Sequence, residues 1–222
     1  MNRATDERNA EQNGAERFEL VSRIADDVAH ELKNPLNSIV INLEVLRNRV
    51  RSGQPDAALD RAEVIDAELR RLHALLEAML RLLRPGRRDR EVVALADVLE
   101  DVAALAQAQA RVAQRPLVID SIPDDMFVRV RRDALRFTLL HVIQTALRAA
   151  APDGVGVRLA ATRRADLVAL RIEAAGVPAT ELDTLASLGN LLSESGVVES
   201  ECRDGDGGSA CTLLLAQARE LA

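Results

Sequence analysis

A seam of apolar residues at alternating steps of four and three runs through residues 58–83, and no other feature of the sequence constrains the fold as strongly. This spacing puts one apolar stripe on an α-helix and is typical of helices that pack side by side. Residues 16–51 carry a similar stripe and are predicted to form another helix. The two stripes consist of Val21, Ile24, Val28, Leu32, Leu36, Ile39, Leu43, Leu46 and Val50, and of Ala58, Ala62, Ile65, Leu69, Leu72, Leu76, Met79 and Leu83.

A short turn joins the two predicted helices. Gly53 suits the end of the first helix and Pro55 suits the start of the second. We therefore predict a helical hairpin over residues 16–84, preceded by a disordered tail over residues 1–15. Several leucines lie off the seam and widen the apolar surface beyond what one partner helix can cover: Leu59, Leu75, Leu80 and Leu82. We expect two copies to pair into a four-helix bundle, so that the protein is a homodimer.

The composition excludes several classes of partner. The 222 residues include three Phe but no Trp or Tyr, so the core must be aliphatic and base stacking on single-stranded nucleic acid is not expected. The net charge of −6 argues against a general polyanion binder. No apolar run approaches the length of a membrane span, and two cysteines fit a reducing compartment. We expect a cytoplasmic protein that binds neither nucleic acid nor membrane.

One face of the first predicted helix carries polar residues that packing does not explain. His30 lies about 200° round the helix from Val28, so it should point away from the apolar stripe into solvent. Glu31 follows it directly, and Asn34 lies one turn later on the same face as His30. Pro35 then leaves the Glu31 carbonyl without an amide donor in a helix that continues beyond it. An exposed histidine beside a carboxylate and a carboxamide indicates a functional site.

The run His30-Glu31-Leu32-Lys33-Asn34-Pro35 resembles the phosphoacceptor box of bacterial sensor histidine kinases, whose usual form is H-E-x-x-N-P or H-E-x-x-T-P. The resemblance implies that His30 accepts a phosphoryl group and that Glu31 accepts a hydrogen bond from one ring nitrogen. It implies that Asn34 orients water in the phosphatase reaction on the phosphorylated regulator. It also implies a dimeric bundle, as expected above, and response-regulator receiver domains as partners.

Residues along the His30 face predict where such a partner docks. Steps of four and three from His30 lead along a polar ridge to an apolar residue, Ile41, with Val45 one turn beyond it. An exposed apolar residue near the phosphoacceptor suits an anchor for a receiver-domain helix, and packing of Ile41 against the second copy of the hairpin explains it equally well. The predicted partner-binding residues are Lys33, Asn37, Ile41, Glu44 and Val45.

After a linker over residues 85–90, the pattern changes to mixed α/β. Helices are predicted over residues 95–114 and 131–150 and within residues 180–192. Strands are predicted over residues 116–120, 125–130, 155–162, 167–173, 197–203 and 209–216. Helices interleaved with antiparallel hairpins indicate a two-layer α/β sandwich over residues 91–222. This order is similar to the Bergerat-type ATP-binding domain of the same kinases, so the predicted fold class is an α hairpin bundle followed by an α/β domain.

Three motifs that hold ATP in the family are incomplete here. The family's asparagine ligand for Mg²⁺ corresponds to Thr145, whose hydroxyl is a weaker ligand than a carboxamide. The D-x-G-x-G motif keeps Gly176, with Glu173 as the nearest acid, and the glycine-rich phosphate motif keeps Gly189. We therefore expect a degenerate nucleotide domain with weak or no ATP binding and no bound cofactor, and Mg²⁺ supplied by the response regulator.

The sequence thus predicts a histidine phosphotransferase that carries a phosphoryl group on His30 to or from receiver domains and has lost autokinase activity. Three other readings remain open: a regulator phosphatase that uses Asn34, a divergent active kinase, and a non-catalytic scaffold. The two other histidines, His73 and His141, are predicted to be structural.

Overall fold

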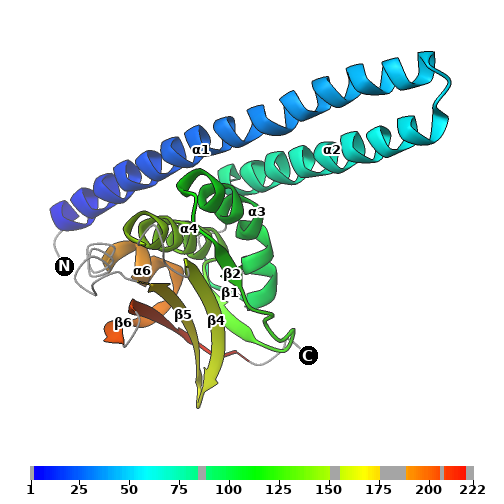
Figure 1. The fold of residues 1–222 in the computed structure, drawn as a ribbon. Helices are drawn as coiled ribbons and strands as arrows, with labels where there is room; N and C mark the ends of the chain where they lie inside the picture. Colours follow the sequence, from blue (N-terminus) through cyan, green and yellow to red (C-terminus); the bar gives the residue numbers. More distant parts are fainter. Residues whose placement is uncertain (1–2, 85–88, 151–155, 176–188, 206–207, 219–222) are drawn as a thin grey trace.

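The structure, a computed structural model, describes residues 3–84, 89–150, 156–175, 189–205 and 208–218. Two long antiparallel helices, α1 (Arg3–Arg51) and α2 (Pro55–Leu83), form a hairpin (Figure 1). Gly53 takes a φ of 68° in the connecting turn, and Pro55 is the first residue of α2. Both residues occupy the positions that their backbone preferences favour. The predicted helical hairpin is confirmed.

Helix α1 begins earlier than its apolar stripe does. It starts at Arg3, whereas the polar composition favours a disordered tail over residues 1–15. This segment contains Ala, Glu, Gln and Arg, which have high helix propensity. Because adding a residue to an existing helix costs much less than starting one, the segment can extend α1 without an apolar face of its own.

The chain from Glu91 onward forms an α/β sandwich. Its five-stranded sheet has the order β2-β4-β5-β7-β6, in which β2 is parallel to β4 and the other pairs are antiparallel. Strands β1 and β3 form a separate antiparallel pair. Helices α3 and α4 lie between the sheet and the hairpin (Figure 1). The elements are β1 (Glu91–Ala94), α3 (Leu95–Ala113), β2 (Leu117–Ile119), β3 (Phe127–Val130), α4 (Arg132–Ala149), β4 (Val157–Arg164), β5 (Leu167–Ala175), α6 (Gly189–Ser195), β6 (Val197–Gly205) and β7 (Gly208–Ala216).

The predicted two-layer α/β architecture is confirmed, with three differences in detail. Strand β1 has no counterpart in the prediction. The helix predicted within residues 180–192 falls mostly outside the described residues, and α6 begins at Gly189. Residues 85–88 of the predicted linker also lie outside the described residues. Arg90, at the end of that linker, donates a hydrogen bond to the carbonyl of Ser193 at 2.9 Å.

The base of the hairpin and the second domain share one hydrophobic core. Side chains from both hairpin helices are buried in the same cluster as the inner faces of α3 and α4; those from the hairpin are Leu20, Ile24, Val28, Ala78 and Leu82. Pro35 is the last buried residue along α1. Beyond it, the hairpin projects away from the second domain (Figure 1). His30 therefore lies where the cover provided by the second domain comes to an end.

Each hairpin helix exposes a row of large apolar side chains. They recur at helical steps of three, four or seven, and several are positions of the predicted seam. In this single chain they are at least 39% exposed. We call these residues the bundle face: Leu36, Val40, Leu43 and Val50 on α1, and Leu69, Leu76, Leu80 and Leu83 on α2. Among the described residues, no helix combines the length and the apolar character needed to span a membrane.

Candidate functional site

His30 lies on the outer side of α1. The residue is exposed, and so is Asn34 one turn later. Val28 belongs to the stripe of α1 that is buried in the core, on the other side of the helix. Within the part of the chain that the structure describes, the His30 ring makes no hydrogen bond. The imidazole is therefore open to a second molecule.

Glu31 occupies a different environment from its neighbour. It is 3% exposed, and its Oε2 accepts hydrogen bonds from the guanidinium groups of Arg71 on α2 and Arg111 on α3. The distance from Arg71 Nη2 to Oε2 is 2.6 Å. The sequence predicts that Glu31 pairs with the His30 ring, but in the structure this carboxylate connects three helices. Its two arginine partners lie 40 and 80 residues away in the chain.

Asp27 is the second carboxylate within one turn of His30. It precedes His30 by three residues, so the two side chains lie on neighbouring positions of one helix face. Its Oδ2 accepts a hydrogen bond from Nε2 of Gln144 on α4 at 3.4 Å. Burial raises the pKa of Asp27, and the Gln144 hydrogen bond, Arg148 and His30 act in the opposite direction. The carboxylate is thus held between the phosphoacceptor-like helix and the second domain.

A polar face of α4 lies against this part of α1. His141, Gln144 and Arg148 follow one another at steps of three and four, which places them on one side of α4. Burial lowers the pKa of His141, and the charges of Arg23 and Arg148 lower it further. Gln144 is only 5% exposed. These contacts agree with a structural position for His141 and place two polar groups of α4 beside Asp27.

The predicted docking residues follow His30 along the projecting part of α1. Lys33, Asn37 and Glu44 are exposed, and Val45 is half-buried. Ile41 is 61% exposed in this single chain. The exposure suits both explanations of Ile41, as a receiver anchor and as a contact to a second hairpin.

A second buried carboxylate, that of Asp101, connects α2 and α3 to α4. Asp101 on α3 accepts hydrogen bonds from Arg132 and Arg136 on α4, and its ion pairs with them measure 2.8 and 2.6 Å. Arg81 on α2 lies 3.4 Å from the other carboxylate oxygen. One aspartate therefore joins α2, α3 and α4.

The family's nucleotide-binding positions offer few ligands among the described residues. Thr145 is half-buried on α4, and the carboxamide beside it, that of Gln144, is directed to Asp27. Glu173 on β5 forms an ion pair with Arg171 at 2.7 Å. Gly176 lies outside the described residues, and Gly189 is the first residue of α6. The described residues of these motifs therefore do not fit a metal-bridged triphosphate site.

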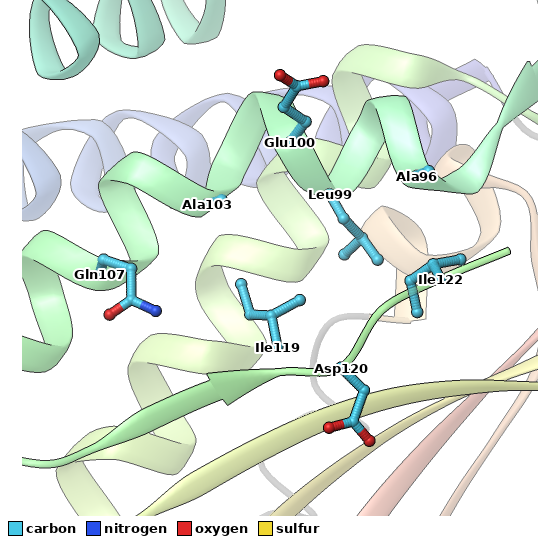
Figure 2. A pocket seen from close by; sticks show the side chains of 8 residues that line it. All are labelled: Ala96, Leu99, Glu100, Ala103, Gln107, Ile119, Asp120 and Ile122. Atoms are coloured by element: carbon cyan, nitrogen blue, oxygen red, sulfur yellow. The ribbon is translucent and has the colours of Figure 1, made fainter. Parts of the chain in front are cut away.

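A pocket of about 320 Å³ lies between α3 and the segment that contains β2. Figure 2 shows Leu99, Ile119 and Ile122 facing one another across it, while the carboxylates of Glu100 and Asp120 point away. No cationic side chain lines it. An apolar hollow without a positive group does not suit a phosphate-bearing ligand.

Comparison with known families identifies the hairpin. Residues 20–88 match the family model of the His Kinase A (phospho-acceptor) domain. The matched segment contains His30, the hairpin turn and all of α2. The match also includes the whole run from His30 to Pro35, which resembles the phosphoacceptor box.

Curated relatives are similar over longer stretches. Sporulation kinase E of Bacillus subtilis (strain 168) is 26% identical over 172 residues, which make up 77% of this chain and 22% of that protein. Sporulation kinase D of the same organism is 22% identical over 144 residues, or 64% of this chain and 28% of that protein. The sensor protein CzcS of Cupriavidus metallidurans is 36% identical over 67 residues, which make up 30% of this chain and 14% of CzcS. The chain thus spans about a quarter of the length of the sporulation kinases.

Solved structures share the fold at low sequence identity. A crystal structure of the histidine kinase ThkA in complex with the response regulator protein TrrA has a TM-score of 0.50 and 16% identity, and the match covers 96% of this chain and 66% of that chain. The catalytic domain of ThkA in a nucleotide-free form also has a TM-score of 0.50, with 14% identity over 58% of this chain and 96% of that domain. Both likenesses concern the fold alone.

Sequence reasoning missed Asp27 and the arginines that hold Glu31. The spacing of three between Asp27 and His30 was the available signal for the first. Nothing local pointed to Arg71 or Arg111, because both reach Glu31 through tertiary packing of α2 and α3.

Proposed function

We propose that this chain, whose residues 20–88 match the phospho-acceptor domain of histidine kinases, carries a phosphoryl group on His30 to or from the aspartate of response-regulator receiver domains. The observation that carries this proposal is the exposed His30 within the matched domain, beside exposed Asn34 and an exposed polar ridge. We propose a receiver domain as the partner because an aspartyl phosphate is a reactive phosphoryl donor that a neutral imidazole can attack.

The transfer is an in-line displacement at phosphorus. One ring nitrogen of His30 supplies the electron pair that forms the N–P bond, while the bond between phosphorus and the receiver's aspartate oxygen breaks and the carboxylate leaves. The proton on the other ring nitrogen stays in place. In the reverse direction, the receiver aspartate attacks phospho-His30 and the imidazole leaves. Any Mg²⁺ that neutralises the phosphoryl oxygens comes, in this proposal, with the receiver domain.

We propose further that the chain does not phosphorylate itself from ATP. Thr145 at the position of the family's metal ligand supports this, as does the carboxamide of Gln144, which bonds to Asp27. The only part of the second domain that the mechanism needs is its contact with the hairpin. The second domain would then serve as a scaffold for the phosphoacceptor helix.

The test is transfer of radiolabel from receiver domains. A panel of receiver domains from the same organism, phosphorylated with labelled acetyl phosphate, is mixed with the purified chain. We expect label to appear on the wild-type chain and to be lost in His30→Ala. His73→Ala is the matched control, because His73 is also an exposed histidine of the hairpin, and it should retain the label. Label that persists without His30, or a wild-type chain unlabelled by every receiver, contradicts the proposal.

Two further arms of the same assay separate the alternatives. Labelled ATP with Mg²⁺ should leave the chain unlabelled. Label at His30 would show that the chain is an active kinase, and it would overturn only the proposed loss of autokinase activity. Regulator phosphatase activity is the second candidate function, favoured by exposed Asn34 one turn from His30. If it operates, Asn34→Ala slows loss of phosphate from the receiver while His30 remains labelled.

A further inference from the structure

The two cysteines of the chain face each other across the last pair of strands. Strands β6 and β7 are antiparallel, and their register places Cys202 directly opposite Cys211. Directly opposite residues of an antiparallel pair carry their side chains on the same face of the sheet. Both residues are thiols in this structure. Because the 222 residues contain no other cysteine, this register brings together every thiol that the chain has.

The cysteines occupy the type of strand pair that has the shorter spacing. Gly205 and Gly208 are the last pair before the turn, with only two residues between them, and a pair that closes so short a turn exchanges hydrogen bonds. Hydrogen-bonded and non-hydrogen-bonded pairs alternate along the strands. Three steps away, Cys202 and Cys211 therefore form a non-hydrogen-bonded pair, in which the Cα atoms typically lie about 4.5 Å apart. A disulfide joins Cα atoms that are roughly 4.4–6.8 Å apart, so the bond fits the strand spacing.

The neighbouring pair on the same face shows that side chains meet across these strands. Asp204 and Ser209 are also opposite each other, two residues along from the cysteines. The hydroxyl of Ser209 donates a hydrogen bond of 2.7 Å to Oδ1 of Asp204. Residues two apart on a strand share a face, so the cysteine side chains extend from the strands in the same direction as this bonded pair.

The two thiols differ in their access to solvent. Cys211 is fully buried, whereas Cys202 is half-buried and packs against the margin of the same core. Among the described strands, β6 is an edge strand of the five-stranded sheet. A small reagent therefore reaches Cys202 first, and Cys211 reacts with a sulfur that is already held beside it.

We propose that Cys202 and Cys211 form a reversible disulfide when the chain meets a small disulfide, the oxidised form of a low-molecular-weight thiol. Cys202 loses its proton, and its thiolate attacks one sulfur of the small disulfide, whose S–S bond breaks and releases one thiolate. Cys211 then loses its proton, attacks Sγ of Cys202 and displaces the second small thiolate. The two released thiolates take up the two protons, so two protein thiols are oxidised while one small disulfide is reduced to two thiols. This site is independent of the proposed phosphotransfer.

The disulfide ties an edge strand to its neighbour. An edge strand pairs on one side and can open locally, and a covalent link between β6 and β7 restricts that opening. We expect the amides of β6 to exchange with solvent at least about 10-fold more slowly in the oxidised chain than in the reduced chain. Hydrogen exchange followed by mass spectrometry measures this difference, and equal rates in the two states would overturn the restraint of β6.

The formation of the bond is tested on the full chain with oxidised glutathione as the small disulfide. After the reaction, remaining thiols are blocked with N-ethylmaleimide, and the protein is analysed by mass spectrometry. We expect wild type to lose two hydrogens, to take up no maleimide and to yield peptides cross-linked through Cys202 and Cys211. Dithiothreitol should restore both thiols. Glutathione adducts without the cross-link, a disulfide between two chains, or thiols that stay reduced would overturn the inference.

Two matched variants test the order of attack, because each keeps one of the two thiols. Cys211→Ala should stop at the mixed disulfide, with glutathione on Cys202. Cys202→Ala should remain unmodified, since its one thiol is buried. Circular dichroism checks that both variants are folded, and the cross-link in wild type does not depend on either of them. Glutathione uptake by Cys202→Ala at the rate of Cys211→Ala would contradict Cys202 as the point of entry.

Discussion

Glu31 and Asp27 flank His30 at a distance of one or three residues, yet their partners give them different roles. Glu31 is buried and accepts two guanidinium groups from α2 and α3. A carboxylate enclosed in this way contributes to folding, because removing it takes the counter-charge from Arg111 and leaves Arg71 only its longer ion pair with Glu68 at 3.7 Å. Asp27 is half-buried, and it accepts a hydrogen bond from Gln144 of α4 at 3.4 Å.

Glu31→Gln should therefore reduce stability more than it affects phosphotransfer. The variant loses the charge that two arginines share, and because both arginines are partly exposed, water recovers part of the loss. We expect the free energy of unfolding to fall by roughly 1–3 kcal/mol, measured by urea denaturation. Transfer per folded molecule should stay close to wild type.

Glu44→Gln is the control for this change, since Glu44 lies exposed on the same helix. Its unfolding midpoint should match that of wild type. Equal unfolding midpoints for Glu31→Gln and Glu44→Gln would contradict the structural role of Glu31. A large loss of transfer in a stable Glu31→Gln variant would show that Glu31 takes part in phosphotransfer.

At the residue scale, the sequence was sufficient to predict that His30 and Asn34 are exposed on one face of α1, but not which groups the carboxylates pair with. The exposure of His30 follows from its angle to the apolar stripe, which is a local property of one helix. The partners of Glu31 are 40 and 80 residues away. Such pairings depend on how α2 and α3 pack, and no spacing within α1 encodes them.

Among the elements, α3 is the one that fixes the second domain to the hairpin. Asp101 binds Arg81 of α2 and Arg132 and Arg136 of α4. Arg111, near the other end of the same helix, binds Glu31 of α1. Two ion-pair clusters on one helix thus supplement the apolar contacts of the shared core.

Asp101→Asn should loosen this attachment. Asp101 is nearly buried, so its replacement leaves guanidinium groups without compensation, at a cost of about 3 kcal/mol. Urea denaturation measures the loss, and proteolysis between the domains should accelerate. Glu100→Gln changes the adjacent exposed carboxylate of α3 and should leave both measurements unchanged. Equal behaviour of the two variants would show that the Asp101 cluster does not hold the domains together.

At the element scale, segments with local signals were predictable and those stabilised by distant pairing were not. Helices α3 and α4 and the hairpin of β4 and β5 carry their own periodicity and turn residues, and the observed bounds lie within a few residues of the predicted ones. Strand β1 has four residues and exists through its pairing with β3, more than thirty positions later. The predicted stripe that contains Ile24 and Val28 correctly indicated packing, but it did not include Leu20, which is buried beside them, and it did not reveal that α3 and α4 cover these residues.

The whole molecule leaves the bundle face uncovered, which supports the proposed homodimer. Six of its eight apolar side chains stand at positions of the two predicted stripes. Burying them against a second hairpin is favourable by roughly 1.5–3 kcal/mol for each fully buried side chain before the cost of association. We expect the purified chain to be a dimer at micromolar concentration and Leu76→Asp to be a monomer, as measured by light scattering after size exclusion.

Val198→Asp supplies the control. Val198 is 62% exposed but lies on β6, outside the hairpin, so its replacement should leave the dimer intact. A monomeric wild-type chain would exclude the bundle, and a monomeric Val198→Asp together with a dimeric Leu76→Asp would move the interface from the hairpin to the second domain.

Because Pro35 is the last buried residue of α1, it also marks the side from which a second protein can reach His30. Toward its start, α1 packs against the second domain, whereas past Pro35 α2 alone among the described elements accompanies it and the hairpin projects away from that domain (Figure 1). In the proposed transfer, a receiver domain would therefore approach His30 from the side of the projecting hairpin and contact both the exposed part of α1 and the second domain. Because His30 lies where these two surfaces meet, the shape of both would contribute to the choice of receiver.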